Sequence, residues 1–199
     1  MSRAPHSLPP GYFEALYQAE ADHWRFADSD YEREKYAATL AALPRPRYAH
    51  ALEVGCSIGV LTAQLAARCD RLLAVDAAET ALAEARRRCA GLPQVEFRRL
   101  WLPDEWPAEG GFDLILLSEV VYYLTAADVG LLAARVRAAL RPGGDVLLVH
   151  WTGETDYPLA GDAAAELFIA SAGPGVGVLR QARHERYRLD LLRAAPGPG

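Results

Sequence analysis

Short apolar runs alternate with helix-like segments between His50 and Trp151, and this alternation constrains the fold more than any other feature of the chain. Five runs have the length and apolar content of strands: HALEV, RLLAVD, VEFRRL, FDLILLSEV and DVLLVHW. Strands that alternate with helices form βαβ units, whose right-handed crossovers give a parallel, doubly wound sheet. The run FDLILLSEV is apolar almost throughout, which is typical of a strand buried on both faces.

Two helices are predicted before this region. Apolar residues at helical spacing predict one helix over about residues 11–22 and a second that starts near Ser29. Ser29 and Glu32 form an S-x-x-E capping box, and Pro44 ends the second helix. The polar stretch DHWRFADSD lies between the two helices as a loop.

Further helices are predicted in the sequence after the buried strand. Thr125 and Asp128 cap a predicted helix that runs to Leu140, where the sequence RPGG forms a turn. After Trp151 we expect a helix in DAAAELFIASAG and then two strands joined near Glu185. This hairpin closes the far edge of the predicted sheet.

Composition excludes several classes of protein. The chain has 199 residues, which fits one domain, and a formal net charge of −5. A negative net charge argues against a nucleic-acid binder that works by neutralising phosphates. No apolar run approaches the roughly 18 residues that span a bilayer, and the first ten residues lack the apolar core of a secretory signal. We therefore expect a cytoplasmic protein with no membrane partner.

The cysteines and histidines do not indicate a metal or a disulfide framework. The three cysteines are an odd number, and none belongs to a C-x-x-C pair. We expect three small buried side chains in a reducing compartment and no metal site.

A glycine-bearing turn follows the first predicted strand, at Glu53-Val54-Gly55-Cys56-Ser57-Ile58-Gly59. In open α/β sheets, ligands bind beyond the carboxyl ends of the strands, where this turn lies. The dinucleotide fingerprint G-x-G-x-x-G is absent, and so is the phosphate loop G-x-x-x-x-G-K-[ST]. The turn therefore suits neither a pyrophosphate nor a triphosphate.

An acidic residue, Asp76, ends the next predicted strand. A carboxylate there can accept hydrogen bonds from both hydroxyls of a ribose, while Glu53 can act through the amides of the turn or on a ligand ammonium. An adenosyl group that carries a cationic amino acid instead of phosphates fits this layout. The alternative is a tight turn with Asp76 as a helix cap.

These residues resemble the class I S-adenosylmethionine-dependent methyltransferases over roughly residues 48–151. The resemblance implies a Rossmann-like, doubly wound α/β fold, with a seven-stranded, mostly parallel sheet whose last strand is antiparallel. It also implies an N-terminal helical lid or cap over residues 1–47 and a methyltransferase core over residues 48–195. S-adenosylmethionine would be the cofactor, S-adenosylhomocysteine the product, and a small molecule the methyl acceptor.

The resemblance assigns cofactor contacts residue by residue. Gly55, Cys56 and Gly59 would line the methionine part, and Asp76, followed by Ala77, would hold the ribose. Further positions that it places near the cofactor are Glu53, Ser57, Leu100, Trp101 and Ser118. Two positions depart from the family pattern: Ser57 replaces the middle glycine, and the adenine-binding Asp after the third strand has no clear counterpart in RRLWLPDEWP, where Asp104 or backbone groups would take its place.

A narrower resemblance rests on the segments DHWRF and YEREKY, together with ALEVGCSIGVLT and SEVVYYL. These are similar to the nodulation protein S family, whose members N-methylate an amino sugar of a lipo-chitooligosaccharide. In such proteins the N-terminal segment folds over the cofactor, so Trp24 would cover it and Arg25 would pair with its carboxylate. The acceptor is not fixed by the resemblance, because related sequences serve other acceptors.

Four residues are candidates for acting on the acceptor. An amine or hydroxyl acceptor has to lose a proton, so a base within hydrogen-bond reach is one requirement. Glu119, Tyr122 and Tyr123 follow the apolar strand, and His150 ends the next one. Each also has a structural interpretation, as a residue that bonds the backbone or packs in the core.

Two further functions remain open from the sequence. One is an oxidoreductase with a nucleotide cofactor on a similar sheet, which the missing G-x-G-x-x-G disfavours. The other is a non-catalytic module that binds S-adenosylmethionine. The oligomeric state does not follow from the sequence.

Overall fold

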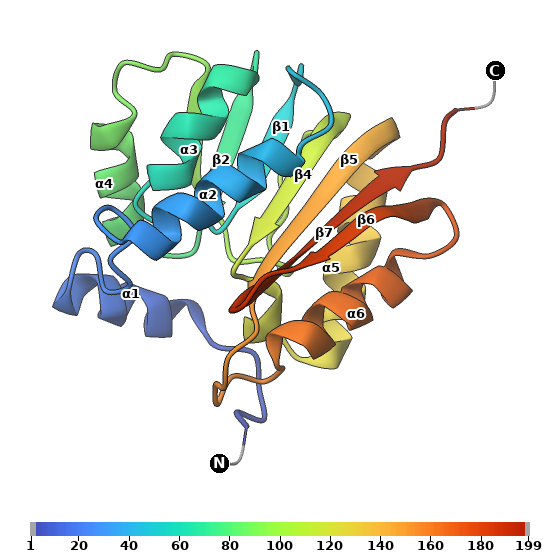
Figure 1. The fold of residues 1–199 in the computed structure, drawn as a ribbon. Helices are drawn as coiled ribbons and strands as arrows, with labels where there is room; N and C mark the ends of the chain where they lie inside the picture. Colours follow the sequence, from blue (N-terminus) through green and yellow to red (C-terminus); the bar gives the residue numbers. More distant parts are fainter. Residues whose placement is uncertain (1–2, 198–199) are drawn as a thin grey trace. The chain divides into compact units, whose positions relative to one another are not determined.

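The computed structural model describes residues 3–197, which form two compact units. One unit runs from Pro9 to Trp101, and the other combines residues 3–8 with residues 102–197. Figure 1 shows the chain coloured along its length. The boundary of the predicted lid at residue 47 does not coincide with either unit and stays a prediction.

The Pro9–Trp101 unit carries three parallel strands in the order β3-β2-β1. Its elements are α1 (Pro10–Ala19), α2 (Asp30–Ala42), β1 (Ala51–Val54), α3 (Val60–Leu65), the 3₁₀ turn η1 (Ala66–Arg68), β2 (Leu72–Asp76), α4 (Glu79–Arg88) and β3 (Val95–Arg99). Strand β1 is buried throughout, and β2 is buried up to Asp76. The acidic residue therefore marks the point where the apolar strand reaches its polar end.

Local capping signals fix the two N-terminal helices. Helix α1 begins with a proline at its first position, where the missing N–H costs nothing. It ends at Ala19, about one turn earlier than predicted. The Ser29 side chain accepts a hydrogen bond from the Glu32 N–H, so the predicted cap of α2 is confirmed.

The second unit carries four strands in the order β4-β5-β7-β6. Its elements are β4 (Phe112–Ser118), the 3₁₀ turn η2 (Val121–Tyr123), α5 (Ala126–Ala139), β5 (Leu140–Trp151), α6 (Gly161–Ala172), β6 (Val176–Arg183) and β7 (Tyr187–Ala194). Strand β7 is antiparallel to both of its neighbours, and β4 and β5 are parallel. Helices α5 and α6 pack against each other, and α6 contacts β5 and β7 (Figure 1). The predicted C-terminal hairpin and its edge position are confirmed.

The sequence RPGG departs from the regular ladder where a turn was predicted, but it lies within β5 rather than before it. Helix α5 is capped by Thr125 as expected, but β5 begins directly at Leu140, which pairs with Phe112. The regular ladder resumes where Leu114 pairs with Asp145, so residues 141–144 form an irregularity within the strand. Gly143 has a φ of 71°, a left-handed conformation that this irregularity requires.

Residues 3–8 form an N-terminal strap on the second unit. The N–H of Ala4 donates to the Asp156 carbonyl at 2.8 Å, and the N–H of Leu8 donates to the Tyr123 carbonyl at 2.9 Å. The Ser7 hydroxyl accepts from the Thr125 N–H at 2.8 Å. The strap therefore joins the loop after β5 to the start of α5.

Candidate functional site

The glycine turn after β1 has a left-handed backbone at three positions. Gly55, Ser57 and Gly59 have φ angles of 77°, 52° and 78°. Glycine adopts such angles without steric cost, whereas serine does not. A Cβ at Gly59 would also lie 3.0 Å from both Cα and Cβ of Ala85 on α4, so glycine is required there for packing as well. The turn is thus held close to α4.

Asp76 joins the end of β2 to this turn. Its Oδ2 accepts from the Ser57 N–H and its Oδ1 from the Ala78 N–H, both at 2.9 Å. Burial raises the pKa of the Asp76 carboxyl, and the backbone N–H groups of Ala78, Ser57 and Ala77 counter that rise. Each carboxylate oxygen can still accept a second hydrogen bond, so the bonds within the turn leave room for a ligand hydroxyl.

Glu53 is a buried acid at the same end of the sheet. Its side chain is 1% exposed, and its Oε2 has no hydrogen-bond partner among residues 3–197. Burial raises the pKa of Glu53 to about 8; the Thr62 hydroxyl lowers it, and the negative charge of Asp76 raises it further. Glu53 is therefore mostly protonated at neutral pH, and a cation placed beside it would favour ionisation.

The other predicted cofactor residues of this unit lie close to the turn or to the end of β2. The Cys56 thiol is buried, and burial raises its pKa well above the ordinary value. The N–H of Leu100 donates to the Asp76 carbonyl at 3.0 Å, and the Trp101 ring lies 6.3 Å from that of Phe13 on α1. All three cysteines of the chain are buried.

The loop between α1 and α2 carries the predicted lid residues. The Trp24 ring stacks on Phe26 at 5.5 Å and meets Tyr17 edge-on at 5.5 Å. Arg25 has a φ of 57°, and its exposed guanidinium pairs with Asp28 through two hydrogen bonds. The predicted roles of Trp24 and Arg25 toward the cofactor stay predictions.

In the second unit, Glu119 follows β4 with a left-handed backbone, at a φ of 58°. Its Oε2 accepts from the Tyr122 hydroxyl at 2.7 Å and from the Trp151 N–H at 2.8 Å, while its own N–H donates to the Val149 carbonyl. The carboxylate therefore bridges the ends of β4 and β5. Ser118, just before it, is buried.

One ring nitrogen of His150 and the hydroxyl of Tyr122 each bond a nearby group. The His150 ring is buried, and its Nε2 accepts from the Val121 N–H at 3.2 Å, so a neutral ring carries its proton on Nδ1. Burial and the charge of Glu119 raise the pKa of Tyr122 well above its usual range, which keeps that hydroxyl a donor. These contacts favour structural positioning by both residues.

Three tyrosines gather beside Glu119. The Tyr122 ring stacks on Tyr157 at 5.3 Å, and Tyr123 lies 4.6 Å from Tyr122 and 4.7 Å from Tyr157. Tyr157 was not predicted from the sequence. It lies outside every helix and strand, six residues after the end of β5, and only its place after a strand end could have indicated it.

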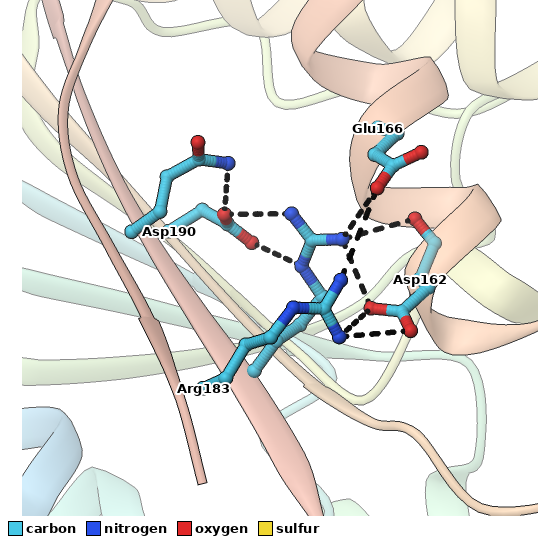
Figure 2. A network of polar contacts seen from close by, with 6 residues as sticks. Asp162, Glu166, Arg183 and Asp190 are labelled. Carbon is cyan, nitrogen blue, oxygen red and sulfur yellow. Dashed lines mark hydrogen bonds and ion pairs between the residues drawn. The ribbon is translucent and has the colours of Figure 1, made fainter.

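An ion-pair network built on the buried pair Arg188 and Asp190 lies elsewhere in the same unit (Figure 2). The Arg188 guanidinium makes two hydrogen bonds to Asp190, at 2.8 and 2.9 Å, and bonds Asp162 and Glu166 on α6. Arg183 also pairs with Asp162. The network borders a cleft of about 290 Å³. Because its charged groups already bond one another, it acts as a clamp between α6 and the hairpin.

The first residue of α6 approaches β5 very closely. A Cβ on Gly161 would lie 1.8 Å from the Trp151 carbonyl oxygen. Only glycine permits this contact. Since the Trp151 N–H bonds Glu119, the start of α6 supports the strand end that positions that carboxylate.

Metal-ligand clusters and membrane-spanning helices are both absent from the described part of the chain. No three His, Cys, Asp or Glu side chains within residues 3–197 come together as metal ligands would. None of the helices in that range is both long enough and apolar enough to cross a membrane.

Comparison with known proteins decides the family. A family model described as nodulation protein S (NodS) matches residues 15–148. The chain is 33% identical over 180 residues to nodulation protein S of Rhizobium tropici, covering 87% of this chain and 70% of that protein. The chain belongs to the nodulation protein S family. Members of this family are class I S-adenosylmethionine-dependent methyltransferases, so the predicted enzyme class is confirmed over the oxidoreductase alternative.

Solved structures support the fold of this nodulation protein S family member. A putative methyltransferase from Pseudomonas syringae is 40% identical, with a TM-score of 0.71 over 82% of this chain and 98% of that one. The N-methyltransferase NodS from Bradyrhizobium japonicum in complex with S-adenosylhomocysteine matches 92% of this chain and 97% of that one, at a TM-score of 0.77 and 23% identity. The predicted Rossmann-like fold, with an antiparallel last strand, is confirmed. The chain spans 49% to 70% of the length of the curated NodS relatives.

Proposed function

We propose that this protein transfers the methyl group of S-adenosylmethionine to the amine nitrogen of a small molecule, with an amino sugar as the first acceptor class to test. The Pro9–Trp101 unit would hold the cofactor through the glycine turn, Asp76 and Glu53. Glu119 is the residue that we expect to act on the acceptor. Relatives described as NodS, including an N-methyltransferase, support the choice of nitrogen over oxygen.

The observation that carries this proposal is the unpartnered Oε2 of Glu53, which lies at the same strand ends as Asp76. A buried carboxyl oxygen without a hydrogen-bond partner is costly in a protein, and a ligand ammonium would satisfy it. Asp76 retains acceptor capacity for ribose hydroxyls, and no phosphate-binding loop is present. These residues therefore fit an adenosyl ligand with a cationic amino acid rather than a nucleotide with phosphates.

The bound cofactor supplies an activated methyl group on a sulfonium, so the protein has mainly to position and desolvate the acceptor. The two donors on Glu119 Oε2 fix its orientation, and a carboxylate offers lone pairs for further hydrogen bonds. We propose that Glu119 binds the protonated amine and accepts its proton. Tyr122 stays protonated, and His150 already accepts a backbone N–H, so neither is as well suited to be the base.

Two measurements test the proposal. Isothermal titration with S-adenosylhomocysteine should show binding that Asp76→Asn weakens at least about tenfold, because a charge-assisted bond to each ribose hydroxyl is lost. The exposed Asp70, which pairs with Arg47, provides the matched control Asp70→Asn, and this variant should bind like the wild type.

Methyl transfer is then measured from labelled S-adenosylmethionine to glucosamine oligosaccharides and to their N-acetylated counterparts. Transfer of the labelled methyl group only to the oligosaccharides with free amines supports N-methylation. With these substrates, Glu119→Gln should lower kcat/KM by about 10²-fold. Label in both series would point to a hydroxyl acceptor. Tight cofactor binding without transfer to any amine would favour the non-catalytic module.

A further inference from the structure

Ser57 has an unusual backbone for a serine. It lies between Gly55 and Gly59 with a φ of 52°, a conformation in which a Cβ is crowded by the following carbonyl. The family resemblance puts a glycine at this position, and glycine would adopt this angle without that crowding. A residue keeps a strained backbone only when the contacts around it hold it in that conformation. The contacts of Ser57 therefore need an explanation.

Ser57 joins two parts of the Pro9–Trp101 unit. Its N–H donates to Oδ2 of Asp76 at 2.9 Å, and its hydroxyl oxygen accepts a hydrogen bond from the Tyr17 hydroxyl at 2.5 Å. Tyr17 belongs to α1, which precedes the turn by about forty residues in the chain. A glycine at position 57 would keep the bond to Asp76 but could not make the bond to Tyr17.

Tyr17 is held firmly where it meets the turn. Its side chain is 5% exposed and packs in a cluster with Ile58, Ala78 and Ala81, against which Trp24 also lies. Burial and the negative charge of Asp76 raise the pKa of Tyr17 well above its usual range, so its hydroxyl remains a donor throughout the physiological pH range. The donor and the acceptor are therefore both fixed before any ligand binds.

A second side-chain contact holds the same helix in place. Glu14, one turn before Tyr17, accepts hydrogen bonds from the N–H and the hydroxyl of Thr80 at the start of α4. This contact anchors α1 without touching the glycine turn. It therefore offers a comparison between general anchoring of the helix and the specific bond to Ser57.

We propose that the hydrogen bond between Tyr17 and Ser57 is a latch that ties helix α1 to the glycine turn and slows the release of the adenosyl ligand. The inference rests on the proposed function, because it places that ligand on the turn and Asp76. A ligand held there lies next to Ser57, which is bonded to α1 and to Asp76 together. The ligand can leave quickly only when α1 separates from the turn, and this separation breaks the latch. Tyr17 is thus a positioning residue that acts through Ser57.

A double-mutant cycle tests the latch. Tyr17→Phe and Ser57→Ala each remove one hydroxyl and keep the packing, and each should speed the dissociation of S-adenosylhomocysteine about threefold to tenfold, the loss expected for one neutral hydrogen bond. The double variant should be no faster than either single one, because both remove the same bond. Thr80→Ala should add its own effect to that of Tyr17→Phe, since it removes a separate contact.

Dissociation rates come from stopped-flow mixing with S-adenosylhomocysteine at several concentrations, followed by tryptophan fluorescence. Ser57→Gly separates the latch from backbone strain: it relieves the strain but also removes the hydroxyl, so it should release the ligand as fast as Ser57→Ala. Circular dichroism establishes that each variant is folded. The latch would be overturned if Tyr17→Phe released the ligand at the wild-type rate. It would also be overturned if the rate increases of Tyr17→Phe and Ser57→Ala multiplied in the double variant. Neither result would affect the proposed function. Absence of S-adenosylhomocysteine binding by the wild type would instead overturn both.

Discussion

Replacing Glu53 by glutamine should make the protein more stable at neutral pH and change how its stability depends on pH. The folded protein keeps the Glu53 proton up to a pKa of about 8, whereas the unfolded chain loses it at the ordinary value of 4.5. Between these values the unfolded state binds fewer protons, so the free energy of unfolding falls as the pH rises. Above about pH 8 this contribution becomes constant, and below pH 4.5 it vanishes.

The size of the effect follows from the two pKa values. Each unit of difference corresponds to about 1.36 kcal/mol, so ionisation of Glu53 in the unfolded chain lowers the free energy of unfolding by about 3 kcal/mol at pH 7. The same arithmetic gives about 1 kcal/mol at pH 5 and about 4 kcal/mol at pH 8. Glutamine keeps the shape of Glu53 and carries no titratable group. The stability of Glu53→Gln relative to wild type should therefore increase by about 3 kcal/mol from pH 5 to pH 8.

Urea unfolding of both proteins at pH 5, 6, 7 and 8, followed by circular dichroism, measures this difference. Glu185→Gln serves as the control, because Glu185 lies at the hairpin turn with a side chain that is 89% exposed. Its unfolding free energy should follow the wild type at every pH. If the curves for Glu53→Gln and wild type run parallel, Glu53 is not a buried neutral acid and the reasoning about its ligand fails with it.

Three further substitutions have definite expected outcomes. Gly161→Ala should lower the free energy of unfolding by more than about 3 kcal/mol in urea titrations, because its Cβ would lie 1.8 Å from the Trp151 carbonyl oxygen, a backbone atom that cannot move aside alone. Arg188→Met should cost about 3 to 5 kcal/mol in the same assay, since it leaves buried carboxylate charge without its partner. Tyr122→Phe removes one of the two donors that hold Glu119 Oε2, so kcat for methyl transfer should fall while S-adenosylhomocysteine affinity in calorimetry stays at the wild-type value.

The two stability predictions have matched controls. Gly130 lies within α5, and a Cβ added there would have no neighbour within 4 Å, so Gly130→Ala should stabilise the protein by about 0.5 to 1 kcal/mol. Arg183→Met removes an exposed member of the Arg188 network and should cost less than about 1 kcal/mol. A Gly161→Ala protein as stable as wild type would contradict the close approach of α6 to β5. A loss for Arg183→Met equal to that for Arg188→Met would contradict the assignment of the buried arginine as the clamp.

The parts of the fold that depend on residues close together in the sequence were predictable. The Ser29 cap, the Thr125 cap and the hairpin turn near Glu185 all follow from short patterns and are confirmed. The turn at RPGG was predictable only in part: residues 141–144 do leave the regular ladder, with Gly143 at a φ of 71°, but Leu140 before them already pairs with Phe112, which no local pattern contains. The partner strand therefore sets where β5 begins, and Gly143 permits the irregularity that follows.

The candidate site divides in the same way. The glycine turn and Asp76 could be identified because their spacing repeats a known pattern within one βαβ unit. The bond from Tyr17 to Ser57 joins residues forty positions apart, and outside the candidate site Arg188 likewise reaches α6 from the last strand. Neither contact has a sequence signature, because many chains carry a tyrosine or an arginine at such positions without forming it.

The strap of residues 3–8 has a consequence for how the chain folds during synthesis. Arg3 donates to the Tyr157 carbonyl, 154 residues further along, and Ala4 donates to the Asp156 carbonyl, whereas the partner of Leu8 is the nearer Tyr123. Arg3 and Ala4 therefore cannot make these bonds until Asp156 and Tyr157 have been synthesised. The contiguous Pro9–Trp101 unit has all three of its strands long before then. Translation thus delivers the glycine turn in a complete unit before Tyr123 and Tyr157 acquire their backbone bonds to the strap.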